Sequence, residues 1–408
     1  MNEQDKTLTA SEAETVENKT DVKNEINNES PQKRPVVWLV LFNTVVSLIL
    51  IICIFITGVL GFSAYLFQDM HYDTDFPNTD NHEALGIDPD ILGKPPIIDT
   101  DTDKEPDSST DKNADKNTDK NNDKNTDKNN DKNVIIRDKI TNIVLFGIDN
   151  KYLVDNTAQN GDSNRSDAII IVSINETKKT VKLTSVLRDS WVPIDFPDGK
   201  RYDKINGAYK AGGPTLAVRT LNQIFGLDIT EYAAIGIDRF DELVDYIGGI
   251  DVTITQEEMT FINLFTYSKE GDENYLSSYG KVRLNGTQAI AFSRNRDLGS
   301  DTERVKRQQL VVQAIFQKIK SNPIGELPQT IRTMLGMIKT SLSYDEIAEL
   351  LPITLENDLK IEKTSLPGDN IPAHGDIFDD TDELWVWKYD LEEAKKFMRK
   401  WVYGIESN

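Results

Sequence analysis

Four arginines lie close together between Phe292 and Gln309, in the stretch FSRNRDLGSDTERVKRQQ. The chain as a whole is acidic, with a net charge of -22 over 408 residues. A local group of guanidinium groups in such a chain indicates a site for concentrated negative charge. Guanidinium forks bind phosphate oxygens in pairs, so phosphate is the first ligand to consider. The alternative is that these arginines form ordinary surface ion pairs with neighbouring acids such as Asp301.

We expect the first half of this stretch to be a strand and the second half a helix. If residues 290–296 are extended, Arg294 and Arg296 project from the same face of the strand. A helix start follows at Ser300 or Asp301. One face of that helix would carry Arg304, Arg307 and Gln308. The positive end of the helix and up to four arginines would then surround a single point. Arg307 is the exception, expected to face outward or to pair with an acid, so the prediction narrows to Arg294, Arg296 and Arg304.

Acids and arginines also flank three other expected strands. Asp149 follows the apolar run NIVLFGI, Arg165 and Asp167 precede AIIIVSI, and Arg188 and Asp189 follow SVL. Taken singly, such residues are often only turn formers or surface ion pairs. Taken together, they would converge on one edge of a sheet. Carboxylate oxygens there suit a divalent cation, and arginines suit the oxygens of a pyrophosphate.

Composition excludes several other chemistries. The only cysteine is Cys53, and the three histidines are His71, His82 and His374. Thiol nucleophiles, Ser-His-Asp triads and zinc-histidine sites are therefore not expected. The acidic balance also argues against a nucleic acid as partner.

The N-terminal part of the chain predicts a single membrane span. Residues 1–34 are polar and predict a disordered cytoplasmic tail. Residues 35–67 predict a transmembrane helix, because Val36 to Phe67 contains no charge and about 20 apolar residues cross a bilayer. A signal peptide is the alternative. Lys33 and Arg34 precede the apolar run, so we expect a cell-membrane protein with a cytoplasmic N-terminus and an extracellular C-terminal part.

Residues 68–137 predict an extracellular low-complexity linker. Asp111 to Asn133 is an array of DKNA, DKNT and DKNN units. Each unit offers almost no apolar surface to a core, so we interpret the array as a flexible tether. An ion-binding or wall-binding repeat is the alternative.

Residues 138–408 predict an α/β domain with a mixed central sheet and helices on both faces. Strands are expected at 142–146, 168–174, 181–186, 231–237, 251–254, 289–293 and 360–365. Helices are expected at 215–224, 238–247, 303–320, 328–339, 344–350 and 390–403. Ligand sites in such folds lie beyond strand ends.

The order of the motifs resembles that of the LytR-CpsA-Psr family of membrane-anchored cell-wall enzymes. The resemblance covers residues 142–316. It rests on Asp149, Arg165-Ser166-Asp167, Arg188-Asp189, Lys204-Ile205-Asn206, Gly212-Gly213-Pro214, Arg294-x-Arg296 and Asp301-x-x-Arg304-x-x-Arg307-Gln308-Gln309. The chain departs from the family pattern at Leu187, where the family often has Pro. It departs again at Asn150-Lys151-Tyr152, where an Arg is common.

The resemblance implies a phosphotransferase. Such an enzyme moves an anionic glycopolymer from an undecaprenyl-pyrophosphate carrier to a peptidoglycan acceptor, through a phosphodiester. The implied metal is Mg²⁺, held by Asp149 and Asp167. The implied pyrophosphate contacts and other site positions are Arg188, Arg294, Arg296, Arg304, Asp301 and Gln308. By their place in the motifs, Arg165, Lys204 and Asn206 are expected to bind substrate.

In the expected mechanism, a sugar hydroxyl attacks the phosphorus next to the glycan and lipid phosphate departs. Asp301 is the candidate proton acceptor. The lipid chain needs an apolar channel, and residues 310–316 and 334–338 either line one or form ordinary core. Two other functions stay open: a non-catalytic polyprenyl-phosphate-binding regulator of the envelope, and a pyrophosphate hydrolase.

Overall fold

The central feature of the computed structural model is a seven-stranded mixed sheet. The structure describes residues 61–62, 64–93, 138–149, 165–323, 325–356, 358–377 and 385–405. The strand order is β1 (His71–Tyr72), β10 (Lys339–Thr340), β7 (Glu231–Gly236), β2 (Ile140–Ile148), β3 (Ser166–Asn175), β4 (Thr180–Val186) and β11 (Lys360–Leu366). The pairs β1–β10, β7–β2 and β4–β11 are parallel and the others antiparallel. The predicted mixed sheet is confirmed.

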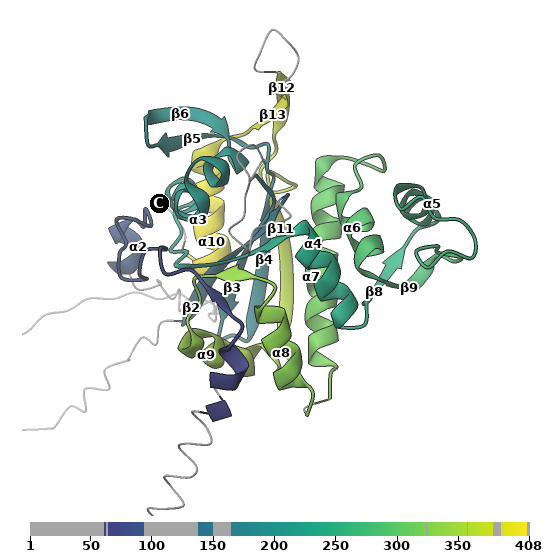
Figure 1. The fold of residues 1–408 in the computed structure, drawn as a ribbon. Coiled ribbons are helices and arrows are strands. Elements are labelled where there is room, and N and C mark those ends of the chain that lie inside the picture. The colour runs from purple at the N-terminus through teal and green to yellow at the C-terminus, as the bar shows by residue number, and fades with distance from the viewer. Residues whose placement is uncertain are drawn as a thin grey trace, which may run out of the picture. The chain divides into compact units, whose positions relative to one another are not determined.

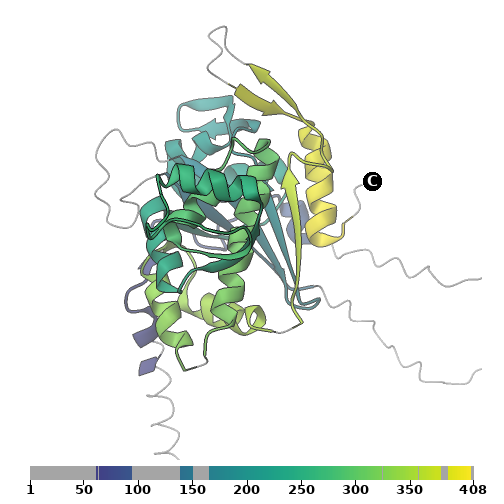
Figure 2. The same cartoon turned by 90° about the vertical axis from the view of Figure 1, so that its right-hand side faces the viewer.

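Helices cover both faces of this sheet (Figures 1 and 2). Alternation along β2 sends Val144 and Phe146 to one face, where they join a core with α3 (Asn206–Phe225) and α10 (Leu391–Tyr403). Ile143 and Leu145 point to the other face and pack with α7 (Asp301–Lys320) and α9 (Tyr344–Thr354). The strands are therefore buried on both sides, as expected for an α/β fold.

Helix α4 (Ile237–Tyr246) and helix α6 (Gly286–Arg294) share a second core with α7. A lobe continues this core through strands β8 (Ile250–Ile254) and β9 (Gly280–Leu284) and helix α5 (Gln256–Phe265). Two further hairpins are β5–β6 (Trp191–Phe196 and Gly199–Lys204) and β12–β13 (His374–Ile377 and Trp385–Lys388). Helix α2 is Pro89–Gly93 and helix α8 is Leu327–Leu335. Of these elements, the sequence predicted only α4, α7, α8 and β8.

The predicted strand at 289–293 is wrong, because these residues lie in helix α6. Asn285 caps this helix by accepting from the backbone N–H of Gln288, whose side chain accepts from the N–H of Asn285. The short apolar run Ala-Ile-Ala-Phe fits a buried strand or a buried helix turn equally well, and the capping box decides between them. The predicted helix 328–339 also ends early, at Leu335, and the chain continues into β10.

The folded unit begins well before the predicted boundary at residue 138. Strand β1 pairs with β10 at the sheet edge, and Leu85 and Ile87 are buried in the core beside α3. The side-chain amide of Asn222 donates to the carbonyl of Leu85 over 2.8 Å. The linker predicted from residue 68 is therefore wrong for residues 68–93, where sparse apolar residues find a long-range partner surface. Residues 94–137, with the DKN array, lie outside the described residues.

The predicted membrane span is not tested by the structure. The cytoplasmic tail at 1–34 and most of the span at 35–67 lie outside the described residues. Among the helices that are described, none is both long and apolar enough to cross a bilayer.

Candidate active site

Two aspartates lie at the same end of two neighbouring central strands, β2 and β3. Strands β2 and β3 are antiparallel, so the end of β2 meets the start of β3, and Ile148 pairs with Ser166 across a bulge. Asp149 follows β2 and its backbone N–H donates to the carbonyl of Arg165 over 3.4 Å. Asp167 is the second residue of β3. The structure thus brings Asp149 and Asp167 together, as the sequence predicted.

Arg188 joins these acids from the end of β4. Its guanidinium forms an ion pair with Asp167, and its Nε lies 3.3 Å from Asp189 Oδ2. The other oxygen of Asp189 accepts from Lys204 Nζ at 2.8 Å. Burial lowers the pKa of Arg188, but the two carboxylates outweigh burial and the net shift is upward. Arg188 is therefore a fixed positive charge at the sheet edge.

Arg304, in the first turn of α7, is the most buried arginine of the group, with a side chain only 5% exposed. Its guanidinium lies 3.2 Å from Asp301 Oδ1. Burial lowers the pKa of Arg304, the nearby positive charge of Arg188 lowers it further, and Asp301 partly compensates. Within the described part of the chain, Arg304 Nε is buried without a hydrogen-bond partner. An anion at this point would satisfy it.

Asp301 connects several groups of the site. Besides Arg304, its Oδ1 lies 4.0 Å from Arg296 Nε. Its Oδ2 accepts from the indole N–H of Trp387, in β13, over 3.2 Å. Both oxygens of Asp301 are thus engaged, and the carboxylate lies close to Arg304 and at the limit of ion pairing with Arg296. Its expected role as proton acceptor stays a prediction.

Arg294 and Arg296 reach the site from a helix end, not from a strand. Arg294 is the last residue of α6, and Arg296 follows the buried Asn295. Arg294 Nη1 lies 3.6 Å from Asp149 Oδ1. The side chains of Arg294 and Arg296 are 44% and 47% exposed, so both can turn toward a ligand.

Arg307 does not belong to the site. It is buried, and its Nε lies 2.7 Å from Glu258 Oε1 of α5. Its other nitrogens donate to the backbone carbonyls of Asn295 and Leu298. This arginine holds the loop between α6 and α7 against the lobe, and so it positions Arg296 indirectly.

The remaining candidates are Gln308, Lys204, Asn206 and Arg165. Gln308 lines the cavity described below, and Lys204 is held by Asp189. Asn206 is buried at the start of α3, and its backbone N–H donates to the carbonyl of Arg188 over 3.3 Å. Arg165 meets Asp149 only through the backbone. Asn206 therefore supports the arginine, and the substrate contact predicted for its side chain stays a prediction.

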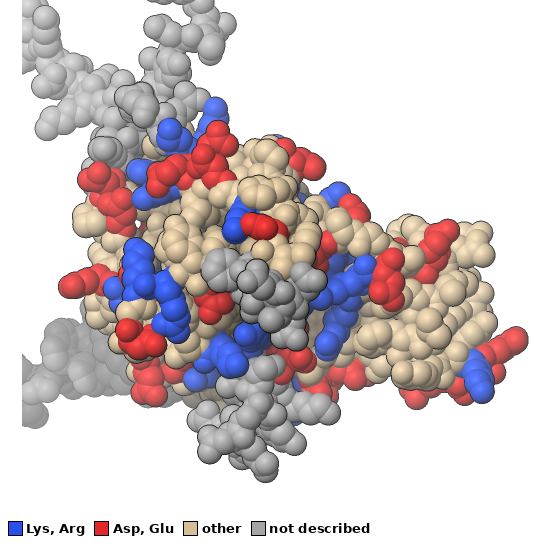
Figure 3. All heavy atoms as spheres, turned by 90° about the horizontal axis from the view of Figure 1, so that it is seen from above, with Lys and Arg blue, Asp and Glu red and all other residues tan. Residues whose placement is uncertain are grey.

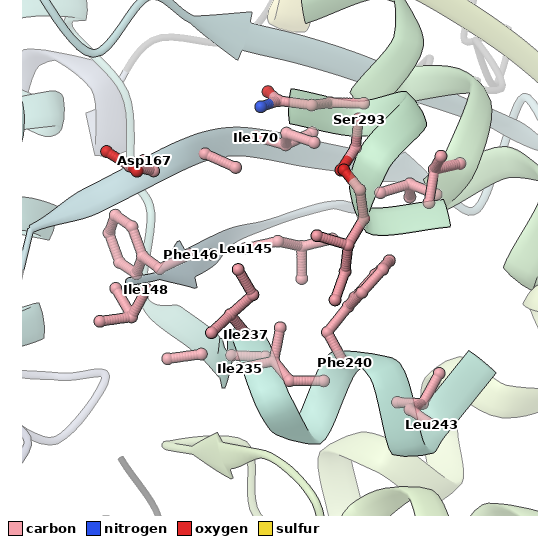
Figure 4. Close-up of a pocket in the computed structure, with 18 of the residues that line it drawn as sticks. Leu145, Phe146, Ile148, Asp167, Ile170, Ile235, Ile237, Phe240, Leu243 and Ser293 are labelled. Atoms are coloured by element: carbon pink, nitrogen blue, oxygen red, sulfur yellow. The ribbon is translucent and has the colours of Figure 1, made fainter. Parts of the chain in front are cut away.

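An apolar cavity of about 310 Å³ opens beside these charges. It lies between the sheet and helices α4, α6 and α7, where Leu145 and Ile170 face Phe240 and Ile237 (Figure 4). Helix α7 contributes Val311, Val312 and Ile315, and Ile338 lies nearby on the chain before β10. Its polar lining residues are Asp149, Asp167, Ser293, Arg294 and Gln308. The cavity thus offers an apolar interior with a charged rim, and Val311, Val312 and Ile315 line it as well as packing the core.

Asp149 and Asp167 could supply only part of the coordination shell of Mg²⁺. Asp149 and Asp167 line the same cavity, and Mg²⁺ is commonly held by one or two carboxylates together with substrate phosphates. Within the described ranges, no group of three or more His, Cys, Asp or Glu side chains could hold a metal ion. A cation here would therefore need phosphate oxygens to complete its shell.

The charges alternate in sign on this side of the molecule. Seen from above, Lys and Arg side chains lie next to Asp and Glu side chains (Figure 3). This pattern agrees with the ion pairs at the site and differs from the continuous basic surface of a nucleic-acid-binding protein.

Sequence reasoning missed three residues that shape the site. Trp387 binds Asp301, Glu258 binds Arg307, and the side-chain amide of Gln309 ties α7 to Ser185 Oγ and to the carbonyl of Thr364. Gln309 stood inside the motif and could have been found there. The other two come from distant segments, so no local pattern pointed to them.

Acids and arginines around the rim of an apolar cavity, on an α/β sheet, have the chemistry that suits an amphipathic anion. The model of the LytR_cpsA_psr family matches residues 107–400, and the chain belongs to this family.

Relatives agree with this assignment. A protein of Enterococcus faecalis named polyisoprenyl-teichoic acid–peptidoglycan teichoic acid transferase TagU is 30% identical over 256 residues, which are 62% of this chain and 78% of the relative. The crystal structure of Bacillus subtilis TagV superposes with a TM-score of 0.52 and 25% identity, covering 65% of this chain and 98% of that one. The structure titled "TagT bound to LIIa-WTA" has a TM-score of 0.51 and 23% identity, covering 65% of this chain and 91% of the other. These structures share the fold.

Proposed function

We propose that this protein is a membrane-anchored phosphotransferase. It would transfer an anionic glycopolymer from an undecaprenyl-pyrophosphate carrier to peptidoglycan and leave a phosphodiester bond. The observation that carries the proposal is the apolar cavity with Asp149, Asp167 and Arg294 at its rim. A polyprenyl chain fits the apolar interior, and its pyrophosphate fits the charged rim. The TagU relative is named for the same class of reaction.

The arginines would bind the pyrophosphate and stabilise the charge that develops during transfer. Arg304 is buried and Arg188 is partly buried, and both are held by acids, so they are pre-oriented and cost little reorganisation at the moment of reaction. Arg294 and Arg296 are about half exposed and would close over the substrate. Mg²⁺ held by Asp149 and Asp167 would supply further positive charge to the phosphate oxygens.

The transfer step exchanges one P–O bond for another. A sugar hydroxyl of the acceptor forms a bond to the phosphorus that carries the glycan. The bond from that phosphorus to the lipid phosphate breaks, and polyprenyl monophosphate leaves with the electron pair. The hydroxyl proton goes to a base. Because the attacking and leaving oxygens lie roughly in line, the acceptor must approach from the side opposite the lipid.

Reconstitution tests this proposal. The full chain in detergent, given a lipid-linked glycan, peptidoglycan oligomers and Mg²⁺, should form a glycan–peptidoglycan conjugate detectable by gel shift and mass spectrometry. Donor binding without turnover would instead indicate a regulator. Free sugar phosphate formed in the presence of acceptor would indicate a hydrolase.

Matched variants separate site chemistry from general damage. Arg296→Ala should abolish most of the transfer with little change in thermal unfolding. Arg283→Ala removes an equally exposed arginine, paired with Asp251 in the lobe, and should leave transfer intact. Equal losses in both variants would argue against the proposed site.

A further inference from the structure

A second cavity lies on the opposite face of the sheet from the apolar one. Its volume is about 700 Å³, and it lies between the β5–β6 hairpin, the end of α3 and the start of α10. The same elements are side by side in Figure 1. The residues that matter here are Trp191, Lys200, Tyr202, Asp390, Glu392 and Lys395, all of which line it. None of them belongs to the candidate active site.

An aromatic platform forms one wall of this cavity. The rings of Trp191 and Tyr202 are stacked, with centroids 6.1 Å apart and an angle of 28° between their planes. Tyr202 is 54% exposed, so part of its ring is open to a ligand. Sugar rings present a flat C–H face that packs on such aromatic surfaces, while polar groups around the ring bind hydroxyls.

The platform is directly connected to the active site. Trp191 is two residues after Asp189 and pairs in register with Lys204, whose Nζ binds Asp189. Between them, Ser190 forms a parallel bridge with Trp387, the residue that binds Asp301. A ligand on the platform would therefore contact Trp191 and Lys388, which directly follow Ser190 and Trp387 in the chain.

We propose that this cavity binds the peptidoglycan glycan strand that accepts the polymer, an inference that rests on the proposed transfer reaction. In-line transfer requires the attacking hydroxyl to arrive opposite the departing lipid phosphate. The lipid cavity lies on the α4, α6 and α7 face, and the aromatic cavity lies on the α3 and α10 face. A strand held on the platform would thus enter from the face that the lipid chain does not occupy.

The charges that line the cavity are of mixed sign. Lys200, Lys388 and Lys395 line it together with Asp390 and Glu392. A ligand there would meet both cationic and anionic side chains. Peptidoglycan carries stem peptides with both carboxyl and amino groups, and these match a lining of mixed sign.

Direct binding tests this assignment without relying on catalysis. The probe is an uncrosslinked peptidoglycan strand with stem peptides, titrated against the full chain in detergent and followed by calorimetry. Trp191→Ala/Tyr202→Ala should weaken its binding about tenfold, equivalent to about 1.4 kcal/mol. Tyr279→Ala removes a comparably exposed aromatic residue, 59% exposed in the lobe, and should change nothing. Far-UV circular dichroism shows that each variant is folded, and Trp191→Phe/Tyr202→Phe should restore most of the affinity.

Two further binding measurements distinguish the acceptor strand from the donor polymer as the ligand of this cavity. Lys200→Glu/Lys395→Glu should weaken binding of the peptide-bearing strand but not of a strand whose peptides an amidase has removed. Binding of the lipid-linked donor should be the same in all variants. Unchanged strand binding in the aromatic double variant would overturn the proposal, and so would a selective loss of donor binding, which would assign the cavity to the donor polymer. If the wild type binds the strand through the platform but makes no conjugate, the proposed transfer fails while the strand site stands.

Discussion

Arg304 and Arg307 lie one turn apart on helix α7, and both are buried, with 4% and 7% exposure. Each nitrogen of the Arg307 guanidinium has a partner, either Glu258 or one of two backbone carbonyls. Arg304 has Asp301 on one side and an unpartnered Nε on the other, within the described chain. A buried charge with a complete set of partners stabilises structure. A buried charge with an incomplete set indicates a place prepared for a ligand.

The largest effect is expected at Arg307. Arg307→Ala removes the cation paired with Glu258 and the donors to two backbone carbonyls, so the free energy of unfolding should fall by about 3–5 kcal/mol. Urea unfolding followed by circular dichroism measures this loss. Arg307→Ala/Glu258→Gln should recover part of it, because the unpaired acid is then gone while an amide oxygen can still accept from the N–H of Thr255. An unchanged free energy of unfolding in Arg307→Ala would contradict the structural role of Arg307.

Arg304 should show the reverse pattern. Burial already lowers the pKa of its guanidinium, which means that the fold holds this charge at a cost in stability. Arg304→Ala should therefore lower the rate of polymer transfer by about 10²–10³-fold with little change in unfolding. Steady-state rates and urea unfolding of the same preparation test both halves. A large loss of stability with little loss of rate would show that Arg304, like Arg307, has a structural role.

The cavity-lining face of α7 offers a third test. Ile315→Trp should fill part of the apolar cavity that Ile315 lines and weaken the binding of a polyprenyl pyrophosphate about tenfold, or about 1.4 kcal/mol. Leu310→Trp is the matched control, since Leu310 lies on the same helix and is 40% exposed. Lipid binding measured by fluorescence should separate the two. Equal binding by both variants would show that the lipid does not bind in this cavity.

The acid Glu231 gives a prediction for how stability depends on pH. Burial raises the pKa of Glu231 from 4.5 to about 8, although the hydroxyl of Ser341 opposes the shift and Glu346 adds to it. Between these values the folded state holds a proton that the unfolded state lacks. Stability should therefore decrease as pH rises from about 5 to 8, by up to about 1.4 kcal/mol per pH unit. Urea unfolding across this range measures the slope, and Glu231→Gln should flatten it. An unchanged slope in Glu231→Gln would show that other groups cause it.

The elements with strong local signals were predicted correctly. Strands β2, β3 and β4 are continuous apolar runs, and α7 and α10 have clear periodicity and start signals, so they were found close to their observed bounds. The hairpin β12–β13 and strands β5, β6 and β9 were missed because they are short and half polar. Helix α6 was predicted as a strand because four apolar residues fit either structure until the cap at Asn285 is seen.

The sequence by itself determined the residue types of the site, its family and the sheet edge where acids and arginines gather. Motif order and charge can be read from the sequence without knowledge of the fold. Only the tertiary structure decided which arginines face the cavity and which hold the lobe, because Glu258 and Trp387 come from distant parts of the chain. It also decided that residues 64–93 belong to the folded unit, since their few apolar side chains are buried only where β10 and α3 provide a matching surface.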